Sequence, residues 1–131
     1  MEYFQNAITL AEYISKKGRL SIKETQRIGR QLFEIVHFIH NKGISHRDLK
    51  PENILINPKK RMIKLIDFGF GIKQISKSTK HFSFVGTLSY MAPEVVAKRE
   101  CMPQPTDLWS LGVILVKMYT GKSPFKGNFE F

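Results

Sequence analysis

Apolar side chains recur at helical spacing in the first third of the chain. Ser21, with Glu24 three residues later, forms the capping-box pattern that begins a helix. Lys42 and Gly43 supply a cation and a glycine where such a helix ends. A shorter helix is predicted before it, at residues 9–16. The apolar stripe of the longer helix consists of Ile28, Leu32, Ile35, Val36 and Ile39.

Two short apolar runs follow, at residues 54–56 and 62–66, and each has the length of a strand. Asn57 and Pro58 between them are turn-forming residues, so the two runs predict a small β-hairpin. Residues 71–85 are polar and lack periodicity, which favours a surface loop.

The last apolar segment, residues 107–120, is apolar nearly all round, a pattern typical of a buried helix. Pro103 and Pro105 are expected to break the chain before it, and residues 95–98 are expected to form one helical turn. No stretch is long and apolar enough to span a bilayer, so no membrane partner is expected. These elements predict an α+β fold that is mainly α.

Composition narrows the protein class. The 131 residues hold at most one domain, and 42% hydrophobic with 24% charged residues is typical of a globular chain. The single Cys101 permits no internal disulfide, and no signal-peptide pattern is present, so we expect a cytoplasmic or nuclear protein. The net charge is +10, but the lysines are scattered and do not alternate with aromatic residues. This favours solvated faces over nucleic-acid binding.

Two short sequences carry the chemistry, HRDLKPEN ending at Asn53 and DFG beginning at Asp67. Asp48 is suited to accept the proton of an attacking hydroxyl, and Lys50 is suited to neutralise a transferring phosphoryl group. Asn53 and Asp67 offer the hard oxygen ligands that magnesium prefers, and they converge if the predicted hairpin joins them. The alternative is an ordinary polar loop, in which Asp48 forms a turn and Asn53 is a cap.

The two sequences match H-R-D-L-x-x-x-N and D-F-G, and the chain thereby resembles the protein kinases. The resemblance implies a C-terminal-lobe fragment of a kinase with a small β-hairpin, and with the N-terminal lobe absent. It also implies transfer of the ATP γ-phosphoryl group to a serine or threonine hydroxyl of a protein substrate, with Mg²⁺. The implied segments are the hinge (1–5), helices (6–45), catalytic loop (46–53), hairpin (54–66), activation segment (67–94) and buried helix (107–120).

The same resemblance implies a nucleotide site. The Glu2 carbonyl and the Phe4 amide would face adenine, and Leu55 would lie beneath the ring. His46 and Phe68 resemble two members of the stacked regulatory column of these enzymes.

Two acids are implied to be structural. Asp107 resembles the helix acid that holds the backbone around His46 and Arg47. Glu94 resembles the acid of the A-P-E motif, whose arginine partner is missing from this sequence, and we expect it to be buried and unpaired. The alternative for both acids is a first-turn helix residue, which is also structural.

Lys50 and Thr87 favour a serine/threonine kinase, and the chain most resembles the calcium/calmodulin-dependent and AMP-activated kinase-like group. Arg47 is typical of kinases that an upstream kinase switches on by phosphorylating the activation segment. Ser83 is the phosphosite that the resemblance implies, with Thr79 second. The alternative is that both are solvated loop hydroxyls.

The sequence departs from the family pattern in lacking a G-x-G-x-x-G loop and the lysine of a V-A-I-K strand. Three interpretations remain open. The chain is a piece of a longer serine/threonine kinase, or a catalytically inactive scaffold, decoy or truncated product, or an unrelated basic binding protein. We expect the isolated polypeptide to have negligible kinase activity.

Overall fold

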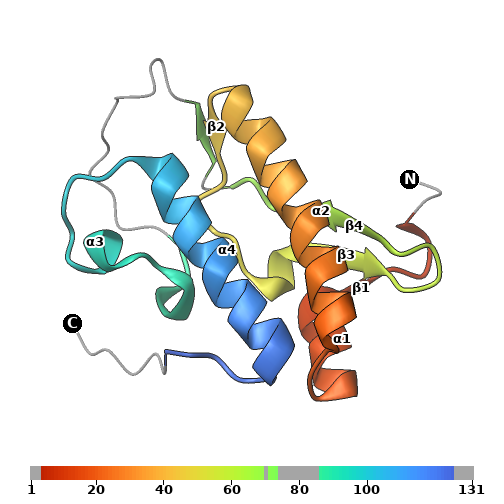
Figure 1. The fold of residues 1–131 in the computed structure, drawn as a ribbon. Coiled ribbons are helices and arrows are strands. Elements are labelled where there is room, and N and C mark those ends of the chain that lie inside the picture. Colours follow the sequence, from red (N-terminus) through yellow and green to blue (C-terminus); the bar gives the residue numbers. More distant parts are fainter. Residues whose placement is uncertain (1–3, 70, 74–85, 126–131) are drawn as a thin grey trace.

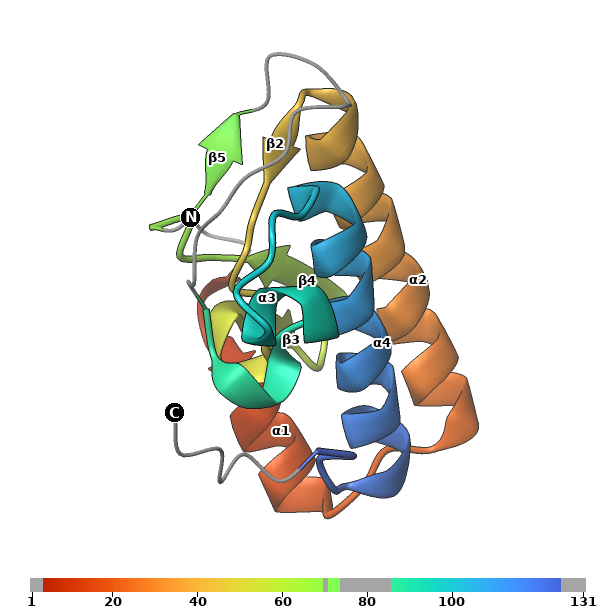
Figure 2. The same ribbon diagram turned by 90° about the vertical axis from the view of Figure 1, so that its left-hand side faces the viewer.

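The computed structural model describes residues 4–69, 71–73 and 86–125. Two long helices, α2 (Ile22–Asn41) and α4 (Pro103–Thr120), lie side by side, and a small sheet packs against α2 (Figure 1; Figure 2). The short helix α1 (Leu10–Lys17) lies beside the start of α2. The architecture is therefore mainly helical, with β-structure confined to small antiparallel sheets.

The two predicted N-terminal helices are confirmed. Thr9 caps α1 by accepting a hydrogen bond from the Glu12 amide at 3.1 Å. The capping box of α2 is complete, because the Ser21 hydroxyl accepts from the Glu24 amide and the Glu24 carboxylate accepts from the Ser21 amide. Gly43 follows α2 with φ 74°, the left-handed conformation that glycine favours.

The predicted hairpin is also confirmed, as strands β3 (Ile54–Asn57) and β4 (Met62–Leu65). Strand β1 (Ile8–Thr9) adds to β3, giving the order β1-β3-β4. A second sheet pairs β2 (Ile44–Ser45) with β5 (Ile72–Lys73), at the start of the segment predicted to be a loop. These two-residue strands are too short to show an alternating pattern in the sequence.

Helix α4 begins at Pro103, so the prediction that the prolines break the chain before Asp107 is wrong. Pro103 is the first helical residue and Pro105 the third. The amides of the first helical turn have no partner within the helix, so a residue that lacks an N–H is tolerated there. Similarly, the short helix α3 (Pro93–Val96) starts at a proline, two residues before the turn predicted at 95–98.

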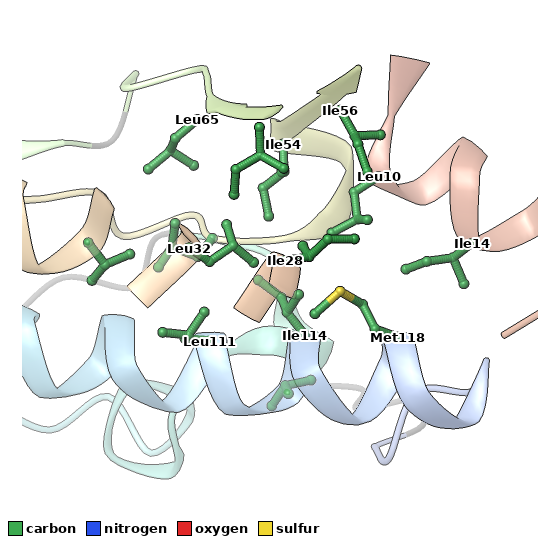
Figure 3. Close-up of a cluster of buried hydrophobic side chains, with 14 of the residues drawn as sticks. Leu10, Ile14, Ile28, Leu32, Ile54, Ile56, Leu65, Leu111, Ile114 and Met118 are labelled. Carbon is green, nitrogen blue, oxygen red and sulfur yellow. The ribbon is translucent and has the colours of Figure 1, made fainter. Parts of the chain in front are cut away.

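The prediction that α4 is buried all round is wrong as well. Leu111, Ile114 and Met118 point into the core, whereas Leu108 is 47% and Tyr119 is 51% exposed. The reason is geometric, since α2 packs against one side of α4. Figure 3 shows the resulting core, built from Ile28 and Leu32 of α2, Ile54 and Ile56 of β3, and the inner face of α4.

The ends of α1 and α4 meet at two glycines. Gly121 ends α4 with φ 74°, and a Cβ placed there would overlap the carbonyl oxygen of Gly18, which ends α1. The Leu20 amide donates to the Met118 carbonyl at 2.8 Å across the same junction. Within the described residues, no helix has both the length and the apolar character needed to cross a membrane.

Candidate functional site

The loop after β2 is anchored by one buried carboxylate of α4. Asp107 is 1% exposed, and its two oxygens accept hydrogen bonds from the amides of His46 and Arg47, each at 2.9 Å. The Nε2 of His40, at the end of α2, lies 2.8 Å from the same carboxylate. Three donors therefore satisfy the buried charge and fix the loop against α2 and α4. Arg47 has φ 66°, so the chain turns sharply there.

The ring of His46 connects this loop to the end of the hairpin. Its Nδ1 accepts a hydrogen bond from the Asp48 amide at 3.1 Å, so Nε2 carries the proton that is donated to the Ile66 carbonyl at 2.9 Å. The ring of Phe68 packs edge-on against it, with 4.7 Å between centroids. His46 is fully buried, and it orders the loop and the DFG segment together.

The two ends of the hairpin lie side by side. The Ile66 amide donates to the Asn53 carbonyl at 2.9 Å, and Asp67 is the next residue along the chain. Asp67 has φ 59° and is exposed, and its carboxylate accepts a hydrogen bond from the Gly69 amide at 3.3 Å. Asn53 is supplied by the short 3₁₀ helix η2 (Pro51–Asn53) that enters β3. Asn53 and Asp67 are thus placed at adjacent chain segments.

The carboxylate of Asp48 lies at the centre of a polar cluster. Asn53 Nδ2 donates to its Oδ2 at 3.2 Å and to its main-chain carbonyl at 2.9 Å. The Thr87 hydroxyl donates to Asp48 Oδ1 at 3.0 Å. Lys50 Nζ donates to the Thr87 hydroxyl at 2.7 Å and lies 3.7 Å from Asp48 Oδ2. Asp48 is 8% exposed, so these donors define its orientation.

Gly86 lets the backbone before Thr87 approach this cluster. Its φ is 114°, and a Cβ would lie 2.8 Å from the Arg47 carbonyl oxygen. A side chain at this position would force apart the two backbones that bring Thr87 to Asp48.

The donor set fits magnesium. Both Asn53 side-chain hydrogen bonds to Asp48 leave from Nδ2, which turns the carboxamide oxygen away from Asp48. Together with the exposed Asp67 carboxylate, this gives two hard oxygen ligands, and magnesium commonly binds one or two carboxylates plus substrate phosphates. In the described part of the chain, no group of three or more His, Cys, Asp or Glu side chains is gathered as a metal site.

A small pocket at the cluster is lined by Arg47, Asp48, Thr87 and Cys101, among others. Burial lowers the pKa of the Arg47 guanidinium, whereas the nearby Asp107 carboxylate acts in the opposite direction. Burial also raises the pKa of the Cys101 thiol, and the Glu94 carboxylate raises it further. Glu94 itself is half-buried rather than buried, so the expected burial of its charge is wrong.

Several expected site residues lie elsewhere or outside the described residues. Glu2, Thr79 and Ser83 belong to the segments that the structure leaves undescribed. Leu55 is half-buried, on the face of β3 opposite the buried Ile54 and Ile56. The ring of Phe4 is half-buried, and Lys64 Nζ lies 5.4 Å from its centroid.

Sequence reasoning missed two residues that hold the site together. His40 contacts Asp107 as described above, and Ser110 Oγ donates to the Tyr90 carbonyl at 2.6 Å, which ties α4 to the segment after Thr87. Ser110 interrupts the apolar run of α4, and that irregularity is a signal in the sequence. His40 is followed by the polar Asn41 and carries no such signal.

Known proteins resemble this chain along almost its whole length. The family described as "Protein kinase domain" matches residues 1–130. Sperm motility kinase 2B of Mus musculus is 41% identical over 89% of the chain, and ribosomal protein S6 kinase alpha-6 of Danio rerio is 51% identical over 88%. Serine/threonine-protein kinase PDK1 of Cryptococcus neoformans is 38% identical over 93%.

These matches cover 24%, 15% and 10% of the three relatives, so the chain spans about a quarter or less of their length. The family match agrees with the HRDLKPEN and DFG motifs of the sequence. The hydrogen bond from Thr87 to Asp48 involves the aspartate of the first motif. The relative from Cryptococcus neoformans is a serine/threonine-protein kinase, and the chain belongs to the protein kinase family.

Proposed function

We propose that this chain supplies the catalytic loop of a serine/threonine protein kinase, which transfers the γ-phosphoryl group of ATP to a serine or threonine hydroxyl. The observation that carries the proposal is the cluster in which Thr87 and Lys50 surround the Asp48 carboxylate, beside the adjacent Asn53 and Asp67. Phosphoryl transfer depends mostly on such positioning and on charge neutralisation.

Each side chain has a role in this proposal. Asp48 accepts the proton of the acceptor hydroxyl, and Thr87 and Asn53 hold its carboxylate in position for that step. The Lys50 ammonium lies next to Asp48 and neutralises the transferring phosphoryl group. Asn53 and Asp67 would hold Mg²⁺, which when bound neutralises phosphate charge.

We also propose that the chain is the C-terminal lobe of its kinase and binds the adenine of ATP through Glu2, Phe4 and Leu55. The outward-facing position of Leu55 on β3 supports a contact with a flat apolar ring. The small share of each relative that the chain matches supports the presence of further kinase segments in a longer protein.

Activation is proposed to depend on phosphorylation at Ser83, with Thr79 as second candidate, by an upstream kinase. The new phosphate would pair with Arg47, whose guanidinium lies beside the catalytic loop. The protein is incubated with an upstream kinase and the phosphate is mapped. Phosphate found only outside residues 76–87 contradicts this part of the proposal.

The alternative that the sequence leaves open is a catalytically inactive scaffold or decoy. Under this alternative, the chain keeps the shape of the catalytic loop without turnover.

The test is phosphorylation of a protein substrate by the longer kinase proposed to contain this chain and by its Asp48→Asn variant, since the isolated chain is expected to have negligible activity. We expect the substitution to lower the rate by about a hundredfold or more, because the proton acceptor is lost while the side-chain volume is kept. The matched control, Glu12→Gln, removes one exposed carboxylate on α1 and leaves the rate unchanged. An equal and measurable rate in wild type and Asp48→Asn contradicts the proposal, whereas no measurable rate in either favours the scaffold.

A further inference from the structure

A pocket lies at the opposite end of the β3–β4 hairpin from the catalytic loop. It is formed between the loop before β1, helix α1 and the β3–β4 turn. Figure 1 shows the β3–β4 turn beside the chain before β1 at the edge of the molecule. We call it the basic turn pocket and define it by Gln5, Asn6, Lys16, Asn57, Lys59 and Lys60. Strand β3 separates Asn57 from Asn53 by four residues, or about 13 Å. The pocket is therefore distinct from the polar cluster around Asp48.

The wall of this pocket is built around one buried polar side chain. Asn57 is 5% exposed, and its Oδ1 accepts hydrogen bonds from the amides of Lys59 and Lys60 at 3.2 and 3.1 Å. Its Nδ2 donates to the Gln5 carbonyl at 3.5 Å. Asn57 thus sets the shape of the turn and joins it to the N-terminal loop, so the lysines are presented from a defined backbone.

The charge of the pocket has one sign. Lys16 and Lys59 are exposed, and among the described residues that line the pocket none is acidic. Glu12, one helical turn before Lys16 on α1, is the acid nearest to it on that helix, and it leaves a net positive charge. The half-buried Ile8 adds an apolar contact among the polar side chains. A ligand that fits combines carboxylates with one apolar side chain.

We propose that the basic turn pocket binds an acidic peptide segment of a partner protein, with aspartate or glutamate side chains against Lys16 and Lys59. The carboxamides of Gln5 and Asn6 provide additional donors to such a segment. Because the pocket and the catalytic loop lie at opposite ends of β3, the segment is held without obstructing the site around Asp48. The interaction is electrostatic and weakens with added salt.

The test measures binding of a fluorescent decapeptide of glutamates with one central leucine to the purified protein, by anisotropy. We expect the double variant Lys16→Glu with Lys59→Glu to weaken binding by at least about tenfold, since two attractions become repulsions. The matched control, Lys42→Glu with Lys73→Glu, makes the same change in net charge at the end of α2 and on β5, away from the pocket. It is expected to weaken binding by less than about twofold. Circular dichroism checks that both variants remain folded.

Four results overturn the proposal: no binding by wild type, no loss in the pocket variant, an equal loss in both variants, or displacement of the peptide by saturating ATP. Tighter binding of an oligonucleotide or of phosphatidylserine vesicles through the same two lysines also overturns the choice of partner. The measurement needs no phosphoryl transfer, so an inactive protein would contradict the proposed catalysis and leave this test unaffected.

Discussion

Two carboxylates, one near each end of α2, collect three donors each in very different surroundings. Asp107, beside the last turn, receives His40 Nε2 and the amides of His46 and Arg47. Glu24, in the first turn, receives the Tyr13 hydroxyl at 2.6 Å, Lys17 Nζ at 2.8 Å and the Ser21 amide at 3.4 Å. The two clusters have similar chemistry. They differ in how far the carboxylate is buried and in how far its donors lie from it along the sequence.

The difference decides what each cluster does. The Asp107 side chain is 1% exposed and its donors lie 60 to 67 residues away in sequence, whereas the Glu24 side chain is 19% exposed and its donors lie within 11 residues. A buried charge that loses its partners costs far more than one that water can solvate. Asp107 therefore joins the loop that begins at His46 to the core, and Glu24 stabilises the α1–α2 corner locally.

The largest effect is expected for Asp107→Ala, which would remove the buried acceptor. Three donors then lose their partner, and we expect the free energy of unfolding to fall by about 3–5 kcal/mol. Urea denaturation followed by circular dichroism measures it. Hydrogen exchange at the amides of His46 and Arg47 is expected to accelerate in the same variant.

The control for this prediction is Asp107→Asn, which keeps one acceptor oxygen in the same volume. An intermediate loss is expected, because its amide nitrogen would face a donor. If Asp107→Ala instead cost less than about 1 kcal/mol, the two carboxylates would be energetically alike and the comparison would fail.

The same difference explains how much of the fold the sequence could predict. The capping box at Glu24 was predictable, because it depends on two residues that lie three positions apart in the sequence. The core stripe of α2 was predictable for the same reason. The exposed outer face of α4, with Leu108 and Tyr119, was not, since apolar composition alone does not tell which neighbours are present to cover a helix.

The candidate site divides in the same way. The motifs placed Asp48 and Asn53 before one hairpin and Asp67 after it. This was predictable because the three residues lie within 20 positions of one another in the sequence. The contact of His40 with Asp107 spans 67 residues, and no periodicity encodes such a distance. The start of α4 was predicted wrongly because proline was treated as a helix breaker. Proline is tolerated in the first helical turn, where the backbone amides have no partner within the helix.

A smaller effect is expected for Glu24→Gln. Hydrogen bonds from Lys17 and Tyr13 hold the pKa of the Glu24 carboxyl at about 2, well below its ordinary 4.5. After allowing for the exposure of Lys17, we expect the variant to lose about 1–2 kcal/mol of stability at neutral pH. Urea denaturation at several pH values measures the loss.

The pH dependence has a definite sign. Because folding lowers the pKa of Glu24, its contribution is fully present above the unfolded value near 4.5 and disappears as pH falls toward 2. The difference in stability between wild type and Glu24→Gln is therefore expected to shrink over this window. A difference that stays constant from neutral pH down to about 2 would contradict the role of the Glu24 charge.

The smallest effect is expected for Lys17→Met, which keeps the apolar stem and removes the charge. Lys17 is 44% exposed, so its 2.8 Å ion pair with Glu24 is screened by water and salt. We expect a loss of at most about 0.5–1 kcal/mol at low salt, falling toward zero at roughly 1 M salt. Urea denaturation at the two salt concentrations gives the comparison. A loss as large as that of Glu24→Gln at both concentrations would mean that the ammonium, rather than the Tyr13 hydroxyl and the Ser21 amide, accounts for the stability of this corner.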